Sequence, residues 1–216
     1  GETVGTTTYA YDLLDRVTAV TADGVETTYT YDANGNRASQ TTGAVTTTYT
    51  YNKANLVTGM FNILLNDDGE DVVISEFAYT YYADGNQRTK TETLLGGDPV
   101  TTTYVYDGLG RLTGETTGED SITYTYDASG NRIGMNQNGT VTAYAYDANN
   151  RLLSETVGDT VTTYTYDANG NTLTAGDKTY TYNDRGQQTG YSNGTATAAY
   201  AYNPSGLRKA KTVGGS

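Results

Sequence analysis

The side chains best placed for chemistry are the acidic and amide residues that follow pairs of tyrosines. The segment Asp32-Ala33-Asn34-Gly35-Asn36 has oxygen-bearing side chains at its first, third and fifth positions, as a calcium-binding loop does. The same pattern begins again at Asp127 and Asp167. Glycine, however, stands at the fourth position instead of the sixth, and no glutamate follows at the twelfth. Because Asp and Asn also close turns by bonding their own backbone, we expect structural turns and no bound metal.

Catalysis has few candidate residues in this chain. The sequence has no histidine and no cysteine, which removes Ser-His and Cys-His arrangements and the usual zinc ligands. Paired carboxylates occur at Asp67/Asp68 and at Glu70/Asp71. A solvated hairpin tip explains these carboxylates better than the acid pair of a glycosidase. We therefore expect no enzymatic activity, no catalytic residue and no cofactor.

Two other recurring residue types can contact ligands. Arg37, Arg111, Arg132 and Arg151 can bind an anion, but the chain has a net charge of −12. These arginines are therefore expected to pair with nearby carboxylates or to stack on tyrosine rings. The tyrosines can stack on sugars, although their regular spacing favours a ladder of cross-strand pairs that holds a sheet together. Glycan binding stays open for the exposed minority of the rings.

One repeating pattern places all these residues. The pair Tyr-x-Tyr occurs ten times and accounts for twenty of the 22 tyrosines, so that only Tyr82 and Tyr191 fall outside it. Successive pairs begin 20, 20, 30, 25, 20, 20, 20, 16 and 20 residues apart. The pairs are Tyr9/Tyr11, Tyr29/Tyr31, Tyr49/Tyr51, Tyr79/Tyr81, Tyr104/Tyr106, Tyr124/Tyr126, Tyr144/Tyr146, Tyr164/Tyr166, Tyr180/Tyr182 and Tyr200/Tyr202.

A turn is predicted after each pair. Four residues after the second tyrosine, seven of the ten units have a glycine, and the others have Asp15, Asn55 or Asn150. Gly, Asn and Asp tolerate the left-handed backbone, so this position is expected to have the positive φ that hairpin turns require. The seven glycines are Gly35, Gly85, Gly110, Gly130, Gly170, Gly186 and Gly206.

The segments between the turns are predicted to be β-strands. Residues 27–31 alternate threonine with tyrosine, which puts both rings on one face and threonine on the other. Ten such hairpins give about twenty strands, and a flat sheet of that size would be about 95 Å wide at roughly 4.8 Å per strand. Sheets of this width rarely stay flat. We predict an all-β fold, in which a repetitive β-hairpin array over residues 1–216 forms a long coiled or spiral sheet, as a partial shell or a rod.

The composition predicts a thin structure. Hydrophobic residues make up 36% of the chain, there is no tryptophan, and phenylalanine occurs twice. Tyrosine is therefore expected to line the layer, with no thick aliphatic core. The net charge of −12 disfavours nucleic acid and anionic membrane surfaces as partners. No segment approaches the roughly 18 apolar residues of a membrane span, so no membrane insertion is expected.

One segment interrupts the array. The 30-residue spacing contains the apolar arms 60–65 and 72–77 on either side of an acidic turn. We interpret this segment as a longer apolar hairpin inserted at about 56–78. Such a patch needs a cover, and packing within the assembly is favoured over a specific partner. The candidate packing or partner patch consists of Phe61, Ile63, Leu65, Val73 and Phe77.

The repeat units resemble a known family. Tyr-x-Tyr-Asp-x-x-Gly-Asn-Arg and Tyr-x-Tyr-Asp-x-x-Gly-Arg-Leu are similar to YD repeats, also called Rhs repeats. The resemblance covers essentially the whole chain and is strongest at Tyr29–Arg37, Tyr104–Leu112 and Tyr124–Arg132. The family includes bacterial Rhs and wall-associated polymorphic toxins, shell subunits of insecticidal toxin complexes, and teneurins. Membership implies a β-sheet that spirals into a hollow shell, which in the toxins encloses a C-terminal toxic domain.

These features predict a structural scaffold segment of a secreted or surface bacterial YD-repeat protein, forming part of a β-shell or rod. Adjacent repeats of the same protein are its expected partners, and a toxin cargo not present in this chain is a further candidate. The alternative is a self-assembling extracellular filament or an adhesive module that binds glycans. Because both chain ends lie inside a repeat, self-association through open sheet edges is expected.

Overall fold

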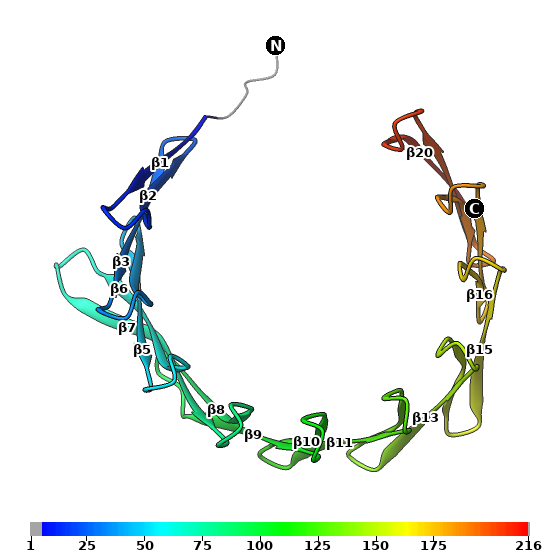
Figure 1. The fold of residues 1–216 in the computed structure, drawn as a ribbon, viewed down its shortest axis with the longest axis horizontal. Coiled ribbons are helices and arrows are strands. Elements are labelled where there is room, and N and C mark those ends of the chain that lie inside the picture. The colour runs from blue at the N-terminus through cyan, green and yellow to red at the C-terminus, as the bar shows by residue number, and fades with distance from the viewer. Residues whose placement is uncertain (1–5, 216) are drawn as a thin grey trace. The chain divides into compact units, whose positions relative to one another are not determined.

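The computed structural model describes residues 6–215, which form twenty β-strands and no helix (Figure 1). The all-β fold expected from the sequence is therefore confirmed. The chain divides into two compact units, Gly1–Ser121 and Ile122–Ser216. Among the described residues there is no helix with the length and apolarity to cross a membrane.

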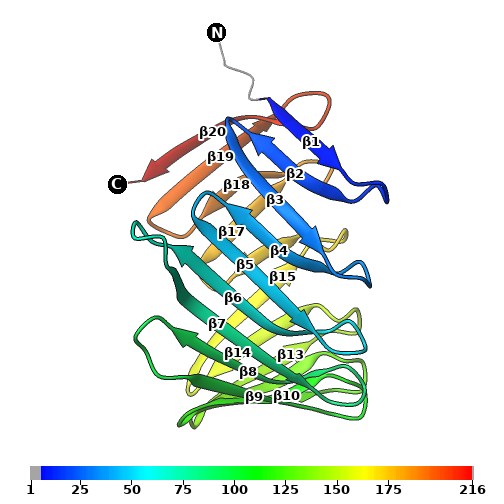
Figure 2. The same ribbon diagram turned by 90° about the vertical axis from the view of Figure 1, so that its left-hand side faces the viewer.

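The first unit is a meander in which each strand pairs antiparallel with the next. Figure 2 shows these strands side by side, with successive turns at opposite ends. The strands are β1 (Thr7–Tyr11), β2 (Val17–Ala22), β3 (Val25–Tyr31), β4 (Arg37–Thr42), β5 (Val45–Tyr51), β6 (Val57–Leu65), β7 (Asp71–Tyr81), β8 (Gln87–Leu94), β9 (Val100–Tyr106) and β10 (Leu112–Thr117).

The second unit is also an antiparallel meander, and its first strand, β11, begins two residues before Ile122. Its strands are β11 (Asp120–Tyr126), β12 (Arg132–Gln137), β13 (Thr140–Tyr146), β14 (Leu152–Val157), β15 (Thr160–Tyr166), β16 (Thr172–Ala175), β17 (Lys178–Tyr182), β18 (Gln188–Ser192), β19 (Ala196–Tyr202) and β20 (Arg208–Gly215). The odd-numbered strands of both units end with a tyrosine pair and are called tyrosine strands. The even-numbered strands that follow are called return strands.

The register within the ten hairpins is constant. The second tyrosine always lies opposite the first residue of its return strand, six positions later, as Tyr31 lies opposite Arg37. A β-bulge follows at once, because the residue before that tyrosine pairs two residues further along, as Thr30 pairs with Ser39. Bulges increase local twist and release backbone groups from the ladder. Each hairpin therefore has the same irregularity beside its tyrosine-end turn.

The register between hairpins is constant as well. The residue before the first tyrosine lies opposite the third residue of the preceding return strand at every junction between hairpins seen within the two units. Thr48 lies opposite Ser39 where the spacing is 20 residues, and Ala78 lies opposite Gly59 where it is 30. The varying repeat length therefore leaves the tyrosine end of the strands unaffected.

The opposite end of the hairpins absorbs the length differences. Regular repeats close there with two residues, such as Asp23-Gly24, whose φ values of 50° and 83° fit the mirror-image turn of tight hairpins. The 30-residue repeat has longer strands instead, nine residues in β6 and eleven in β7. The 16-residue repeat has shorter ones, four residues in β16 and five in β17.

Each sheet is one layer thick. No hydrophobic side chain of the described residues is fully buried, which confirms the expected absence of an aliphatic core. In β3 the two tyrosines are half-buried, whereas Thr28 and Thr30, which alternate with them, are exposed. On the threonine face, hydroxyl pairs join neighbouring strands, as in Thr30–Ser39 at 2.6 Å and Thr80–Thr89 at 2.6 Å. Tyrosine and threonine side chains thus lie on opposite faces of the sheet, as their alternation along the strand predicts.

The inserted segment forms the long hairpin of β6 and β7, with apolar side chains on both faces. Leu65 and Val73 are 51% and 45% exposed. Phe61 pairs with Thr48 on the threonine face, whereas Phe77 pairs with Met60, which lies opposite Tyr49 on the tyrosine face. Ile63 and Leu65 alternate onto the face of Phe61, and Val73 lies opposite Ile63, so that of the five residues of the proposed patch only Phe77 lies on the other face. Successive side chains of a strand point to opposite faces, so the apolar residues of one arm do not all share a face. The spacing of the repeats did not reveal which face each residue takes.

Candidate functional site

The turn after each tyrosine pair is closed by the side chain that follows the pair. In the turn at Asp32, Oδ1 accepts hydrogen bonds from the backbone N–H of Asn34 at 2.9 Å and of Asn36 at 2.8 Å. The backbone N–H of Gly35 donates to the Asp32 carbonyl at 3.1 Å. Asn52 closes its turn with the same two side-chain bonds. The Asp of the repeat therefore has a structural role, which an asparagine can also fill.

The aspartate form of the turn adds a second bond through Oδ2. The donor is Asn36 Nδ2 in one turn at 3.0 Å and Arg151 Nε in the turn at Asp147 at 2.7 Å. The side-chain amide of Asn36 lowers the pKa of Asp32, and the backbone N–H of Arg151 lowers that of Asp147. The pKa values of four further turn carboxylates are lowered by similar bonds, in Asp12, Asp107, Asp127 and Asp167.

Metal binding has little support in these turns. Both carboxylate oxygens of Asp32 already accept hydrogen bonds from their own turn. Across residues 6–215 there is no group of three or more His, Cys, Asp or Glu side chains that could hold a metal ion.

A second set of contacts joins several of the hairpins to the one before them. The hydroxyl of the second tyrosine donates to the carbonyl of the first residue in the preceding return strand, beside the bulge. We call this contact the tyrosine latch. It is formed by Tyr31–Val17, Tyr51–Arg37, Tyr81–Val57, Tyr146–Arg132, Tyr166–Leu152 and Tyr202–Gln188, at 2.5–3.0 Å. Burial raises the pKa of Tyr51, Tyr81 and Tyr146 above the ordinary tyrosine value.

The turns themselves are also linked from hairpin to hairpin. Asn36 Nδ2 donates to Asn55 Oδ1 at 2.9 Å, and Asn131 Nδ2 donates to Asn150 Oδ1 at 2.8 Å. Where the next turn has glycine in place of Asn55 or Asn150, the backbone can take the bond, as Gln187 Nε2 donates to the Gly206 carbonyl at 3.0 Å. Either glycine or asparagine thus occupies this position, which has a positive φ and faces the preceding turn.

The arginines contact carboxylates and rings, as the sequence indicates. Arg16 pairs with Asp12 at 2.7 Å and stacks over Tyr31 of the next hairpin at 4.5 Å. Arg37 stacks over Tyr29 of its own hairpin at 4.6 Å. Arg132 bridges two hairpins, because its guanidinium lies 5.6 Å from the Tyr124 ring centre and 4.8 Å from that of Tyr144.

One turn departs from the pattern. Tyr82 replaces the aspartate, and the capping role moves to Asp84, whose Oδ1 accepts from the Asn86 N–H at 3.0 Å. The Tyr82 hydroxyl donates to the Tyr104 carbonyl at 3.0 Å. Its ring meets the edge of Tyr106 with centres 6.2 Å apart. The larger side chain therefore gives up the turn contact for a contact with the next hairpin.

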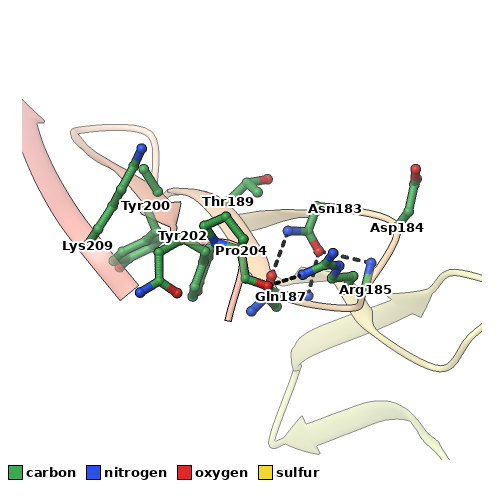
Figure 3. Close-up of a pocket in the computed structure, with 11 residues that line it drawn as sticks. Asn183, Asp184, Arg185, Gln187, Thr189, Tyr200, Tyr202, Pro204 and Lys209 are labelled. Atoms are coloured by element: carbon green, nitrogen blue, oxygen red, sulfur yellow. Dashed lines mark hydrogen bonds between the residues drawn. The ribbon is translucent and has the colours of Figure 1, made fainter. Parts of the chain in front are cut away.

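A shallow hollow of about 660 Å³ lies between the last two tyrosine-end turns (Figure 3). Tyr200, Tyr202 and Pro204 line it, together with Lys209. Figure 3 shows the Arg185 side chain reaching across to the other turn, where Nη1 donates to the Pro204 carbonyl at 2.9 Å. Its rings and amides could contact a sugar, but its polar groups chiefly join the two turns.

Apart from the patch on β6 and β7, the residues singled out in the sequence lie at the tyrosine ends of the hairpins. The seven predicted turn glycines have φ values between 71° and 90°, and Asp15, Asn55 and Asn150 are also positive. The tyrosines mostly pair across strands with other residue types. Tyr29 lies opposite Gln40 and Tyr144 opposite Glu155, while Tyr180 and Tyr191 form a ring pair at 5.6 Å.

One recurring position was missed. The third residue of every return strand is small, because it faces the residue before the second tyrosine at the bulge. A Cβ on Gly59 would lie 2.7 Å from Thr50 Oγ1. These residues are Ala19, Ser39, Gly59, Thr89, Gly114, Gly134, Ser154, Thr174, Gly190 and Ala210. Their offset of eight residues from the second tyrosine was visible in the sequence, but its meaning depends on the register.

Comparison with solved structures finds the same fold in toxin complexes. The structure of TcdB2-TccC3-Cdc42 matches with a TM-score of 0.70 at 18% identity, covering 98% of this chain and 14% of that chain. A mutant of the Photorhabdus luminescens Tc holotoxin pore matches with a TM-score of 0.70 at 19% identity, covering 95% and 12%. This chain therefore spans about an eighth of the length of these structures. No curated protein sequence matches it.

Family comparison agrees with the repeat geometry. The RHS Repeat family model matches residues 11–45. The Teneurin YD-shell family model matches residues 65–213, which is more than half of the chain. With its uniform hairpins, latches and linked turns, the chain belongs to the YD-shell family of Rhs-type repeat proteins and is a segment of a structural shell scaffold.

Proposed function

We propose that this segment is a non-enzymatic wall, whose task is to hold neighbouring hairpins in one fixed lateral register. The constant register carries this proposal, since it persists while the repeat spacing changes from 16 to 30 residues. In such a linear array, stability is the sum of repeat and neighbour terms, so a wall can be extended without a common core.

The described side chains support a wall more than a reaction site. Turn carboxylates such as Asp32 accept bonds within their own turns, and second tyrosines such as Tyr51 and Tyr146 donate to the preceding hairpin. A positioned acid, base or nucleophile needs a free group directed at a substrate. These contacts favour a structural role that needs no cofactor.

Hydrogen–deuterium exchange of the 216-residue chain tests this proposal. We expect slow exchange along the tyrosine ends of successive strands, with faster exchange at the opposite turns. Assays with ester, phosphate and glycoside substrates should give no turnover. Rapid exchange at the tyrosine ends, or turnover abolished by one substitution, would overturn the proposal.

For the intact protein, we propose a secreted or surface-exposed bacterial shell that encloses a protein cargo. The family assignment and the fold shared with Tc toxin structures support this proposal. Fractionation of the source cells tests it, with a cytosolic enzyme as control. Recovery at the surface or in the medium is expected, and recovery only in the cytosol would contradict it.

A further inference from the structure

We propose that Tyr180 and Tyr191 form an oxidative cross-linking site, at which hydrogen peroxide and a peroxidase join the two rings as dityrosine. The bond fastens β17 to β18 covalently, in a chain that has no cysteine and can form no disulfide. Such a modification goes beyond the scaffold function, because it changes the covalent structure of the wall.

The register of the hairpins makes this pair of residues unusual. The first tyrosine of each unit lies opposite the residue eleven positions later, which in the β17–β18 hairpin is Tyr191. Within residues 6–215, no other hairpin places two tyrosines directly opposite each other. The residues at the equivalent position of the other hairpins are Val20, Gln40, Met60, Lys90, Glu115, Met135, Glu155, Ala175 and Lys211.

The geometry brings corresponding atoms of the two rings together. Residues directly opposite on adjacent strands project from the same face, with Cβ atoms about 4.5–5.5 Å apart. The ring centres of Tyr180 and Tyr191 are 5.6 Å apart, and the ring planes are inclined by 51°. Both side chains are only half-buried, and the residue opposite Tyr191 on β19 is the small Ala198. The two rings therefore meet at a similar height above the sheet and remain open to solvent.

Two other ring pairs are less suited to coupling. Tyr82 and Tyr106 have centres 6.2 Å apart and planes at 86°, and the Tyr82 hydroxyl is held by the Tyr104 carbonyl. Tyr9 and Tyr11 have centres 6.5 Å apart and lie on one strand. In neither pair do the two residues face each other across a ladder, so the carbons beside the two hydroxyls are not aligned.

The coupling is a two-electron oxidation. The peroxidase removes one electron and one proton from each phenol hydroxyl, and hydrogen peroxide is reduced to two molecules of water. The ring carbons next to the two phenoxyl oxygens then form a C–C bond. Each of these carbons releases its hydrogen as a proton while its own oxygen takes up a proton, which restores the two phenols. The protein loses two hydrogen atoms in total.

The cross-linked hairpin is weakly joined to the hairpin before it. β16 and β17 pair only through Thr174–Thr179 and Ala175–Lys178. The latch is missing there, because the Tyr182 hydroxyl has no hydrogen-bond partner among residues 6–215. A covalent bond between β17 and β18 keeps this short hairpin folded when its junction with β16 opens. This benefit rests on the scaffold function, whereas the coupling itself depends only on the geometry of the rings.

Peptide mapping after oxidation tests the site. The 216-residue chain is treated at low concentration with a peroxidase and limiting hydrogen peroxide, which disfavours bonds between molecules. Trypsin then cleaves after Lys178 and Arg185, so a link between the strands joins residues 179–185 to residues 186–208. The joined peptide has two hydrogen atoms fewer than its two parts, and fragmentation in a mass spectrometer identifies the tyrosines that are coupled.

We expect Tyr180–Tyr191 to be the main coupled pair, at about ten times the yield of Tyr82–Tyr106, because opposed rings react as if highly concentrated. Tyr191→Phe keeps the ring and should remove this joined peptide. Absence of the joined peptide from the oxidised parent chain, or equal yields for the two pairs, would overturn the site.

Two matched variants separate position from composition. Tyr164→Phe removes a first tyrosine that faces Ala175 and should leave the yield of the Tyr180–Tyr191 link unchanged. Met135→Tyr places a second ring opposite Tyr124 and should create a new coupled pair there. A failure of Met135→Tyr to couple would contradict the role of direct opposition across the ladder.

Hydrogen exchange measures what the bond does. In the cross-linked chain, the amides of residues 179–191 should exchange about tenfold more slowly than in the untreated chain, because the link restricts the opened hairpin. Unchanged exchange would overturn the stabilising role. If no coupling occurs in a chain whose tyrosine ends exchange slowly, the site fails and the scaffold function stands, so the two failures are distinguishable.

Discussion

The two ends of each hairpin differ in how much variation they accept. At the tyrosine end, turn, bulge, latch and register are repeated almost without change, from Tyr31 in one unit to Tyr202 in the other. At the opposite end, strands lengthen to eleven residues in β7 and shorten to four in β16. Figure 2 shows the two sets of turns at opposite ends of the first unit.

The difference shows where the array is held together. The tyrosine end contains contacts that run from hairpin to hairpin, whereas the opposite end is closed by local turns such as Asn138-Gly139. A change at the tyrosine end disturbs contacts with a neighbouring turn, whereas a change at the opposite end affects the two strands that its turn joins. Lateral contacts thus restrict one end and leave the other free to vary.

The largest effect is expected where a side chain is forced into the bulge. Gly59→Ala places a Cβ 2.7 Å from Thr50 Oγ1 and 3.1 Å from the Phe61 ring. Overpacking of this kind costs about 1–3 kcal/mol, which should appear as a lower urea midpoint. Gly108→Ala is the control, because it meets no atom within 4 Å and should change stability by less than about 0.5 kcal/mol. Equal midpoints for the two variants would count against a role for the bulge.

A smaller effect is expected from loss of one latch. Tyr31→Phe removes the hydroxyl that donates to the Val17 carbonyl at 2.7 Å, at a cost of about 0.5–1.5 kcal/mol. Tyr29→Phe in the same hairpin keeps the ring under Arg37 and should be close to neutral. Urea unfolding of both variants measures the difference. If Tyr29→Phe is as harmful as Tyr31→Phe, the ring and not the latch carries the stability.

Acid should weaken the tyrosine end gradually. The turn hydrogen bonds lower the pKa values of six aspartates from 3.8, so their stabilisation is present above that value and is lost as pH falls through the lower folded pKa. The urea midpoint should therefore fall below about pH 3.8. Asp32→Asn keeps the Oδ1 acceptor, as Asn52 does, and should reduce the difference between pH 7 and pH 3 slightly. An unchanged or larger difference would argue against this origin.

The smallest effect is expected from trimming the opposite end. Asn62 and Ser75 already face each other, so replacing residues 63–74 by Asn-Gly yields a 20-residue spacing with a two-residue turn. This variant should keep the Tyr81–Val57 latch and melt within a few degrees of the parent. Circular dichroism on heating measures this shift. Unfolding or aggregation would show that the apolar arms are required for the array.

Much of the local structure could be read from the residues. Tyrosine alternation predicted the strands, and Gly35 and its equivalents predicted turns with positive φ. The bulge, the latch and the small third residue were not predicted, because each depends on which residues face each other across hairpins. Tyr146 lies 14 residues from Arg132, and only the lateral register brings them together. The separation of Phe77 from Phe61 was not predicted for the same reason, since pairing assigns those two rings to opposite faces.

A paired insertion tests the central claim most directly. Gly-Ser is inserted into one hairpin end at a time, between Ala128 and Ser129 in the turn after β11, or between Asn138 and Gly139 in the turn after β12. Hydrogen exchange at the amides of residues 142 and 143, which pair with β12, then reports on the β12–β13 junction that both turns adjoin. We predict that the first insertion accelerates this exchange at least tenfold, whereas the second leaves it nearly unchanged. Equal acceleration by both insertions, or a greater effect of the second, would contradict the claim that the tyrosine end holds the array in register.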